Sequence, residues 1–239
     1  MIQAVYAECT VIYTAINKEE SAVIRCMVID RYEQMFYNIG KELSGGSSMN
    51  IYKTCPDVYN ERFRLRLVTQ EDCEDLLKVY SDVKAVPLFN GDNCNGDDFY
   101  YATLERMQQA MSFWIWSYEN GWFVRMSILD LSTGCAVGTI ELCYRDSEDT
   151  GVLRLDLSSD YENEADISAI LSLIVEPSYE WIGCSRLITK ARPIAGERIK
   201  ALTAFGFTPA DAPLIGHDGT EYGDYFERMK REGRYDPKL

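Results

Sequence analysis

The sequence has 239 residues, of which 46% are hydrophobic and 12% aromatic, so it can bury a full core in one large domain, with or without an appendage. Its 38 acidic and 24 basic side chains give a formal net charge of −14. Such a charge repels phosphate backbones and anionic lipid surfaces and attracts cations. We therefore expect neither nucleic acid nor a membrane as a partner, and the charge serves either solubility or a cationic ligand.

The eight cysteines are scattered along the chain and form no C-x-x-C pair. This spacing is typical of small buried residues in a reducing compartment. The first residues lack a basic segment, and Glu8 interrupts a short apolar run, so we expect a cytoplasmic protein without a signal peptide. The single histidine, His217, precedes Asp218-Gly219 and is expected in a surface turn. The sequence therefore predicts no metal site.

Residues 1–57 are expected to form a helical extension. Apolar residues recur at helical spacing over 2–16 and again over 23–43, where Gly45-Gly46 ends the second run. Two helices cannot bury their own apolar faces well. We therefore expect the extension to pack on the main domain, residues 58–239, or on a second copy of the chain in a homodimer.

The main domain begins with a segment of strand periodicity, followed by segments of helical periodicity. Residues Arg62 to Val68 alternate as a half-buried strand, and a helix is expected from Thr69 to about Asp82. Residues Asn90 to Asp98 form a polar loop whose acids lack the spacing of a calcium loop. A longer helix is expected from about Asp98 to Tyr118.

The rest of the chain alternates strands and helices. The segments WFVRMSILD and CAVGTIELC predict two antiparallel strands, followed by the strand VLRLDLS and a helix containing Ile167 and Ile174. The strand RLITKA and a helix from about Ala195 to Phe205, ended by Gly206, come next, and two strands, around 213–217 and 222–230, close the chain. This order predicts an α+β domain with a mixed sheet and helices on both faces.

Three segments of the main domain resemble the GNAT superfamily of N-acetyltransferases. They are RFRLRLVTQEDCEDLLKVY, the hairpin MSILDLSTGCAVGTIEL with Gly138, and ERIKALTAFGF with Gly206-Phe207. The resemblance covers about Arg62 to Arg231 and implies a mostly antiparallel sheet whose fourth and fifth strands splay apart. Acetyl-CoA would enter this gap, with its pantetheine paired to the strand backbone of Arg154, Leu155, Asp156 and Leu157.

In the same family a turn of pattern [QR]-x-x-G-x-[GA] cradles the cofactor pyrophosphate. Here Glu162, Ala165 and Ile167 occupy its three defining positions. Carboxylates at a helix start satisfy the free amides themselves, as a capping box of Ser159 and Glu162 would, and they repel a phosphate. Either this loop is a degenerate cofactor site, which makes acetyl-CoA binding doubtful, or its acids only begin a helix. Arg198 either contacts a cofactor phosphate or lies on a solvated or ion-paired helix face.

Two residues are candidates for acid–base chemistry. Glu141 lies among apolar residues of a central strand, where burial would raise the pKa of a general base; the alternative is that it faces solvent. Tyr161 is a candidate acid and Lys190 an anion contact. The asparagine and tyrosine common in the family's last helix are replaced by Ala195 and Leu202.

Two functions remain open. The first is transfer of an acetyl group from acetyl-CoA to a primary amine, either a cationic small molecule or a protein N-terminus. The second is a catalytically degenerate domain that serves binding or assembly.

Overall fold

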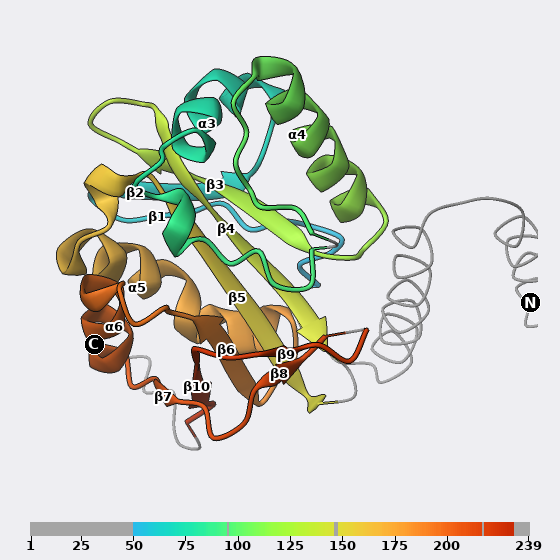
Figure 1. Cartoon of the computed structure of the whole chain (residues 1–239), viewed down its shortest axis with the longest axis vertical. Coiled ribbons are helices and arrows are strands. Elements are labelled where there is room, and N and C mark those ends of the chain that lie inside the picture. The colour runs from blue at the N-terminus through green and yellow to red at the C-terminus, as the bar shows by residue number, and fades with distance from the viewer. Residues whose placement is uncertain (1–49, 95, 146–147, 217, 232–239) are drawn as a thin grey trace, which may run out of the picture.

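The computed structural model describes residues 50–94, 96–145, 148–216 and 218–231 (Figure 1). The two helices expected over residues 2–43 lie outside this part, as does His217. The described chain begins packed in the main core beside the helix that ends at Trp181, because Ile51 is fully buried there and its N–H group faces the carbonyl of Trp181 at 3.5 Å. The boundary expected near residue 57 stays a prediction. Among the described helices, none is long and apolar enough to cross a membrane.

The described chain forms one eight-stranded sheet in the order β1-β2-β3-β4-β5-β6-β10-β7 and a separate pair, β8-β9. All neighbouring strands are antiparallel except β5 and β6, which are parallel. The strands are β1 (Val58–Tyr59), β2 (Phe63–Leu67), β3 (Val124–Asp130), β4 (Ala136–Arg145), β5 (Thr150–Leu157), β6 (Arg186–Lys190), β7 (Thr208–Pro209), β8 (Leu214–Ile215), β9 (Glu221–Tyr222) and β10 (Tyr225–Met229).

Helices cover both faces of the sheet (Figure 1). On one face, α3 (Cys73–Tyr80) and α4 (Leu104–Glu119) pack together around an aromatic cluster. On the other, α5 (Glu164–Trp181) and α6 (Gly196–Ala204) bury the apolar side chains of the central strands. Short 3-10 turns of the described chain include η1 (Gln70–Asp72), η2 (Val86–Leu88) and η4 (Ser159–Tyr161). The expected α+β architecture with a mixed, mostly antiparallel sheet is confirmed.

The alternation of β4 and β5 decides which side chains reach each face. Leucines and isoleucines at even positions of β4 and odd positions of β5 enter the core beneath α5. The neighbouring positions point toward α3 and α4, and there the sheet carries polar and charged side chains instead. The face under α3 and α4 is therefore where the chemistry of this protein is concentrated.

Two sequence-based boundaries are wrong. The helix expected from Asp98 begins at Leu104, because Thr103 caps it by accepting a hydrogen bond from the Arg106 N–H at 3.2 Å and Phe99 has a positive φ of 57°. The last strand expected over 222–230 is divided, since Asp224 has a φ of 63° and separates β9 from β10. The end of α6 is as predicted: Gly206 has a φ of 83° just beyond its last turn.

Candidate functional site

Strands β5 and β6 separate partway along their length. Their parallel ladder runs from Thr150↔Arg186 to Leu153↔Thr189 and ends there. The backbone of the remaining residues of β5, 154–157, is paired on one side with β4 and has no strand partner on the β6 side. We call this opening the fork. The structure thus places the four residues expected to line a cofactor groove, Arg154, Leu155, Asp156 and Leu157, at an open strand edge.

A segment between α3 and α4 crosses the fork on the face covered by these helices. We call it the strap and define it as residues Leu88–Asp92. The Asn90 N–H faces the Asp156 carboxylate of β5 at 3.4 Å, and the Asn90 side chain donates to the Tyr225 hydroxyl of β10 at 3.3 Å. The Asp92 carboxylate accepts from Lys190 of β6 at 2.5 Å. The strap therefore ties together the two strands that form the fork.

A buried polar network continues from the strap across the sheet. Arg125 of β3 donates to Glu141 of β4 at 2.6 Å and lies 3.3 Å from the Asp156 carboxylate. Arg154 of β5 lies 3.3 Å from the second Glu141 oxygen and donates to the Asp92 carbonyl at 3.0 Å. Acids and bases alternate along this chain of contacts, so charge is compensated locally although the groups are removed from water.

The surroundings fix the protonation states of several network members. Burial alone would lower the pKa of Arg125, but the charges of Glu141 and Asp156 and the hydrogen bond to Glu141 outweigh it and raise that pKa. Burial raises the pKa of the Tyr80 hydroxyl well above its ordinary value, and Asp156 adds to this effect. Burial likewise raises the pKa of the Cys94 thiol, although Arg154 lies beside it. Cys94 is thus held as a thiol and is not an activated nucleophile.

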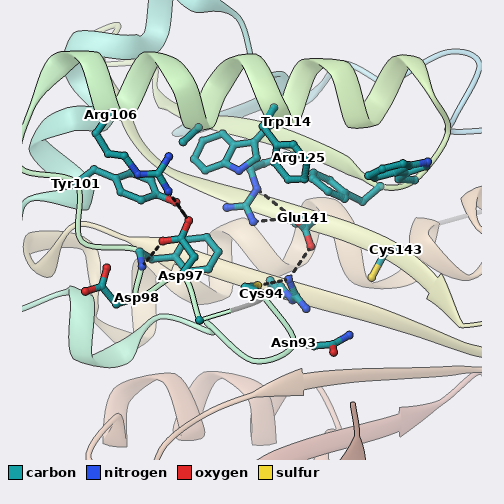
Figure 2. Close-up of a pocket in the computed structure, with 17 residues that line it drawn as sticks. Asn93, Cys94, Asp97, Asp98, Tyr101, Arg106, Trp114, Arg125, Glu141 and Cys143 are labelled. Carbon is teal, nitrogen blue, oxygen red and sulfur yellow. Dashed lines mark hydrogen bonds and ion pairs between the residues drawn. The ribbon is translucent and has the colours of Figure 1, made fainter. Parts of the chain in front are cut away.

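A cavity of about 650 Å³ lies over this network, between α4 and the strands β3, β4 and β5. Figure 2 shows Arg125 and Glu141 side by side beneath Trp114, and Asp97 pointing toward Tyr101 and Arg106 at the other end. The other non-aromatic residues of the wall are Asn93, Cys94, Gly96, Asp98, Ala110, Cys143 and Arg154. Six aromatic side chains also line the cavity, namely Phe99, Tyr101, Phe113, Trp114, Trp122 and Phe123.

Glu141 lies at the centre of this site, but it is neither exposed to solvent nor surrounded by apolar residues alone, the two alternatives that the sequence left open. It is only 2% exposed, so the solvent-facing alternative is wrong. Its two oxygens are engaged by Arg125 and Arg154, so it is not an isolated carboxylate in an apolar pocket. The face it shares with Thr139 is covered by α3, where the Tyr80 hydroxyl lies 2.7 Å from the Thr139 hydroxyl.

Tyr161 lies in a separate environment. Its hydroxyl donates to Asp130 of β3 at 2.9 Å, and its ring packs edge-on against Phe63 of β2. Burial and the hydrogen bond to Asp130 raise the pKa of Tyr161 to about 12, which makes it a reluctant proton donor. In the described part of the chain no hydrogen bond or ion pair joins Tyr161 to Glu141. Lys190, by contrast, lies at the fork, where it binds Asp92.

Two backbone N–H groups at the start of α5 donate to side chains of the protein itself. Asn163, and not Ser159, caps the helix by accepting from the Asp166 N–H at 3.0 Å, so the expected capping box of Ser159 and Glu162 is wrong. Glu162 turns instead to α6 and forms a buried ion pair with Arg198. Burial raises the pKa of Glu162 despite this partner. Arg198 also donates to the Leu88 carbonyl at 3.1 Å, so α6 holds the strap as well.

The other residues of this turn are packed or paired. Ile167 is fully buried in the core beneath the sheet, as a β-branched side chain in the first turn of an apolar helix would be. Asp166 pairs with Arg62. Ala165 is exposed at the helix start, and the Glu164 N–H points to the Glu197 carboxylate at 3.4 Å. Among the described residues, no group of three or more His, Cys, Asp or Glu side chains could hold a metal ion.

Sequence reasoning did not find Asp92, Arg125 or Tyr80. Arg125 had a usable signal, because an arginine inside the strand FVRMSIL must be paired when the strand is central. Asp92 had none, since its loop is rich in Asp, Asn and Gly and looks like an ordinary turn. Only the fold brings that loop to β6, 98 residues further along the chain.

This fold is that of the GNAT acetyltransferases, as expected. A ribosomal-protein-S5-alanine acetyltransferase from Vibrio fischeri superposes with a TM-score of 0.56 at 15% identity, over 75% of this chain and 99% of that one. A GNAT-family acetyltransferase from Bacillus anthracis gives 0.56 at 14%, over 73% and 98%. RimL, a ribosomal L7/L12 alpha-N-protein acetyltransferase in complex with coenzyme A, gives 0.55 at 13%, over 73% and 98%. Neither a family model nor a curated protein sequence matches the chain.

Proposed function

We propose that this protein is an N-acetyltransferase that moves an acetyl group from acetyl-CoA to a primary amine. The observation that carries the proposal is the fork, because an unpaired strand edge at 154–157 offers backbone groups to a pantetheine arm. The cavity beside Arg154 and Glu141 offers room for a second molecule. A protein N-terminus and a small amine are both candidate acceptors, and the similar structures named for ribosomal-protein acetylation support the first.

The residues fit the two halves of the cofactor differently. The fork fits the pantetheine arm. The start of α5 fits a diphosphate poorly, because the Asp166 and Glu164 N–H groups are taken by Asn163 and Glu197, and the buried Arg198 of α6 is neutralised by Glu162. We therefore expect the nucleotide half to contribute little to binding. When bound, acetyl-CoA would supply a thioester as the acyl donor.

The protein's own groups would prepare the amine. Glu141 is the proposed proton acceptor, directly or through a water molecule held by it. Because Arg125 and Arg154 fix both of its oxygens, the carboxylate is oriented before any substrate arrives. Tyr161 remains the proposed acid only if its hydrogen bond to Asp130 is broken, since that bond uses its proton.

Calorimetric titration of the full chain tests the proposal. We expect acetyl-CoA and S-acetylpantetheine to bind with dissociation constants within about tenfold of each other, because the diphosphate lacks a cradle. Acetyl-CoA binding more than a hundredfold tighter than S-acetylpantetheine would contradict the proposed division of the site. Absence of heat and of thermal stabilisation with either compound at millimolar concentration would eliminate the acetyltransferase altogether.

The second candidate is a GNAT-like binding or assembly module without acetyl-CoA. The strap favours it, because Asn90 and Asp92 are 2% and 8% exposed and occupy one face of the fork. A module of this kind would bind no acyl donor but would self-associate, with residues 1–57 as the proposed contact. Sedimentation of the full chain distinguishes the candidates, since a monomer at all concentrations counts against assembly.

A further inference from the structure

The cavity over Arg125 and Glu141 does not share the strong negative charge of the whole protein. With about 650 Å³ it is in the size range of small-molecule sites. Its wall contains three guanidinium groups, from Arg106, Arg125 and Arg154, and three carboxylates, from Asp97, Asp98 and Glu141. The formal charges of the wall therefore cancel. The cavity's preference for a ligand depends instead on which of these groups still have hydrogen-bond donors or acceptors free.

The carboxylates of the wall are largely used by the protein itself. One Asp97 oxygen accepts from Arg106 at 2.6 Å and from the Tyr101 hydroxyl at 3.0 Å, and the other accepts from the Phe99 N–H at 3.0 Å. Both Glu141 oxygens contact guanidinium groups. Asp98 is exposed, at the rim. The interior of the cavity consequently offers little acceptor capacity to an ammonium group.

The aromatic faces are also occupied by cations of the protein. The Arg125 guanidinium lies 4.3 Å from the centre of the Trp114 ring and 5.5 Å from that of Phe99. Arg106 lies 4.6 Å from the centre of the Tyr101 ring. An aromatic wall can bind an organic cation through its ring faces, but here those of three rings already hold guanidinium groups. A cationic ligand would have to displace them.

Donor capacity, in contrast, remains. Arg106 is 43% exposed in its side chain, and Asp97 is its only hydrogen-bond acceptor in the described part of the chain. The Arg154 Nε is buried without a hydrogen-bond partner there. At one end of the cavity Phe113, Trp122 and Phe123 present an aromatic surface that no guanidinium of the described residues covers. The centre of the Phe113 ring lies 6.4 Å from that of Trp122 and 6.1 Å from that of Phe123.

From these contacts we infer that the cavity binds a flat, mainly apolar molecule that carries a carboxylate or carbonyl group. Arg106 would donate to the acceptor group at its end of the cavity, and the apolar part would extend from there toward the aromatic surface of Phe113, Trp122 and Phe123. If the proposed acetyl transfer holds, this molecule corresponds to the part of the acceptor substrate that does not carry the reacting amine. Binding of this molecule needs no acyl donor. The inference can therefore fail while the proposed acetyl transfer holds, and it can hold while the proposed acetyl transfer fails.

A matched pair of probes tests the inference on the full chain. Indole-3-acetate and tryptamine share a ring system and differ in the charge of the side chain. Calorimetry should show indole-3-acetate binding at least about tenfold more tightly. The Arg106→Gln variant should lose most of this preference. Arg64→Gln is the control, because Arg64 is 44% exposed, pairs with Asp57 and lies outside the cavity.

Two outcomes would overturn the inference: tryptamine binding as tightly as indole-3-acetate, or Arg106→Gln and Arg64→Gln reducing binding equally. A second variant, Ala110→Leu, adds three carbon atoms to a residue of the cavity wall and should weaken binding of indole-3-acetate by narrowing the cavity. Unchanged binding in folded Ala110→Leu would also place the ligand elsewhere. Circular dichroism of each variant establishes that it is folded.

Discussion

Lys190 Nζ lies 2.5 Å from Asp92 Oδ2, and this ion pair joins the last residue of β6 to the strap. Both side chains are 10% exposed. The Tyr225 hydroxyl donates to the same Asp92 oxygen at 3.2 Å. The pair lies just past Leu153↔Thr189, the last pairing of the β5–β6 ladder. It therefore holds β6 to the strap at the point where backbone hydrogen bonds no longer join β6 to β5.

Neutralising Asp92 should release the strap. Asp92→Asn leaves Lys190 nearly buried without a counter-ion, and we expect a loss of about 3 kcal/mol in the free energy of unfolding, measured with urea. Amide hydrogen exchange should also become faster in residues 88–94 than in the central strands. Asp57→Asn is the control, since its partner Arg64 is well exposed and the pair should contribute little. Exchange that rises equally throughout the domain would contradict a local role for Asp92.

The acids at the start of α5 should determine how well a nucleotide binds. Glu162→Gln with Ala165→Gly frees Arg198 from its carboxylate and removes a Cβ from the turn. We expect acetyl-CoA to bind at least about tenfold more tightly to this double variant, with S-acetylpantetheine unchanged. Calorimetry measures both. The Glu164→Gln variant is the control, because Glu164 is exposed in the same turn and forms no described ion pair. Equal gains for the two compounds would exclude a phosphate contact at Arg198.

The Arg125 network should be strongly coupled. Arg125→Met leaves Glu141 and Asp156 buried with one cation fewer, and we expect a loss of about 4 kcal/mol in the free energy of unfolding. Adding Glu141→Leu should recover part of this loss, because the uncompensated carboxylate is then removed. Urea unfolding of both single variants and the double variant gives the coupling energy. Strictly additive effects would mean that the two side chains contribute independently of their contact.

The sequence predicted the architecture well because strand and helix patterns survive into the fold. Gly206 ends α6, and the hairpin that contains Gly138 forms β3 and β4 with its turn at residues 131–134, as local signals indicated. Local signals failed where distant groups decide. Asn163 caps α5 in place of Ser159, because α5 begins at Glu164 and Ser159 lies in the preceding turn η4. Glu162, the expected partner of Ser159 in the capping box, pairs instead with Arg198, 36 residues away.

The site was predicted less completely than the fold. Glu141 and Arg154 were both named from the sequence, and the structure brings them together, whereas Tyr161 lies on its own with Asp130. Asp92 could not be found, since its importance depends on the position of β6 relative to a loop. Long-range ion pairs have no period in the sequence, and so they escape pattern-based reasoning.

Asp72 should make stability depend on pH. Burial by itself would raise its pKa, but hydrogen bonds from Arg66 and Ser127 outweigh this and hold the pKa below the ordinary 3.8. The resulting stabilisation is present above 3.8 and is lost as the pH falls through the lowered pKa of the folded state. Asp72→Asn should therefore cost about 2 kcal/mol at neutral pH, with a difference from wild type that shrinks below 3.8. Urea unfolding across this range measures it. Glu71→Gln, in the same turn but exposed, is the control, and a difference independent of pH would contradict the assignment.

Gly138 should be required for the contact between β4 and β5 that supports the fork. A Cβ at this position would lie 2.3 Å from the Asp156 carbonyl oxygen and 2.7 Å from a methyl group of Leu157. Because the first of these atoms is backbone, it cannot rotate away, and β5 itself must shift. We expect Gly138→Ala to lose about 3 kcal/mol in the free energy of unfolding. Gly196→Ala is the matched control, since a Cβ there meets nothing within 4 Å and the residue lies in a helix. That variant should be as stable as the wild type or slightly more stable. Equal effects of the two substitutions would show that β5 yields to the added methyl, and that the fork does not depend on a close approach of its backbone to β4.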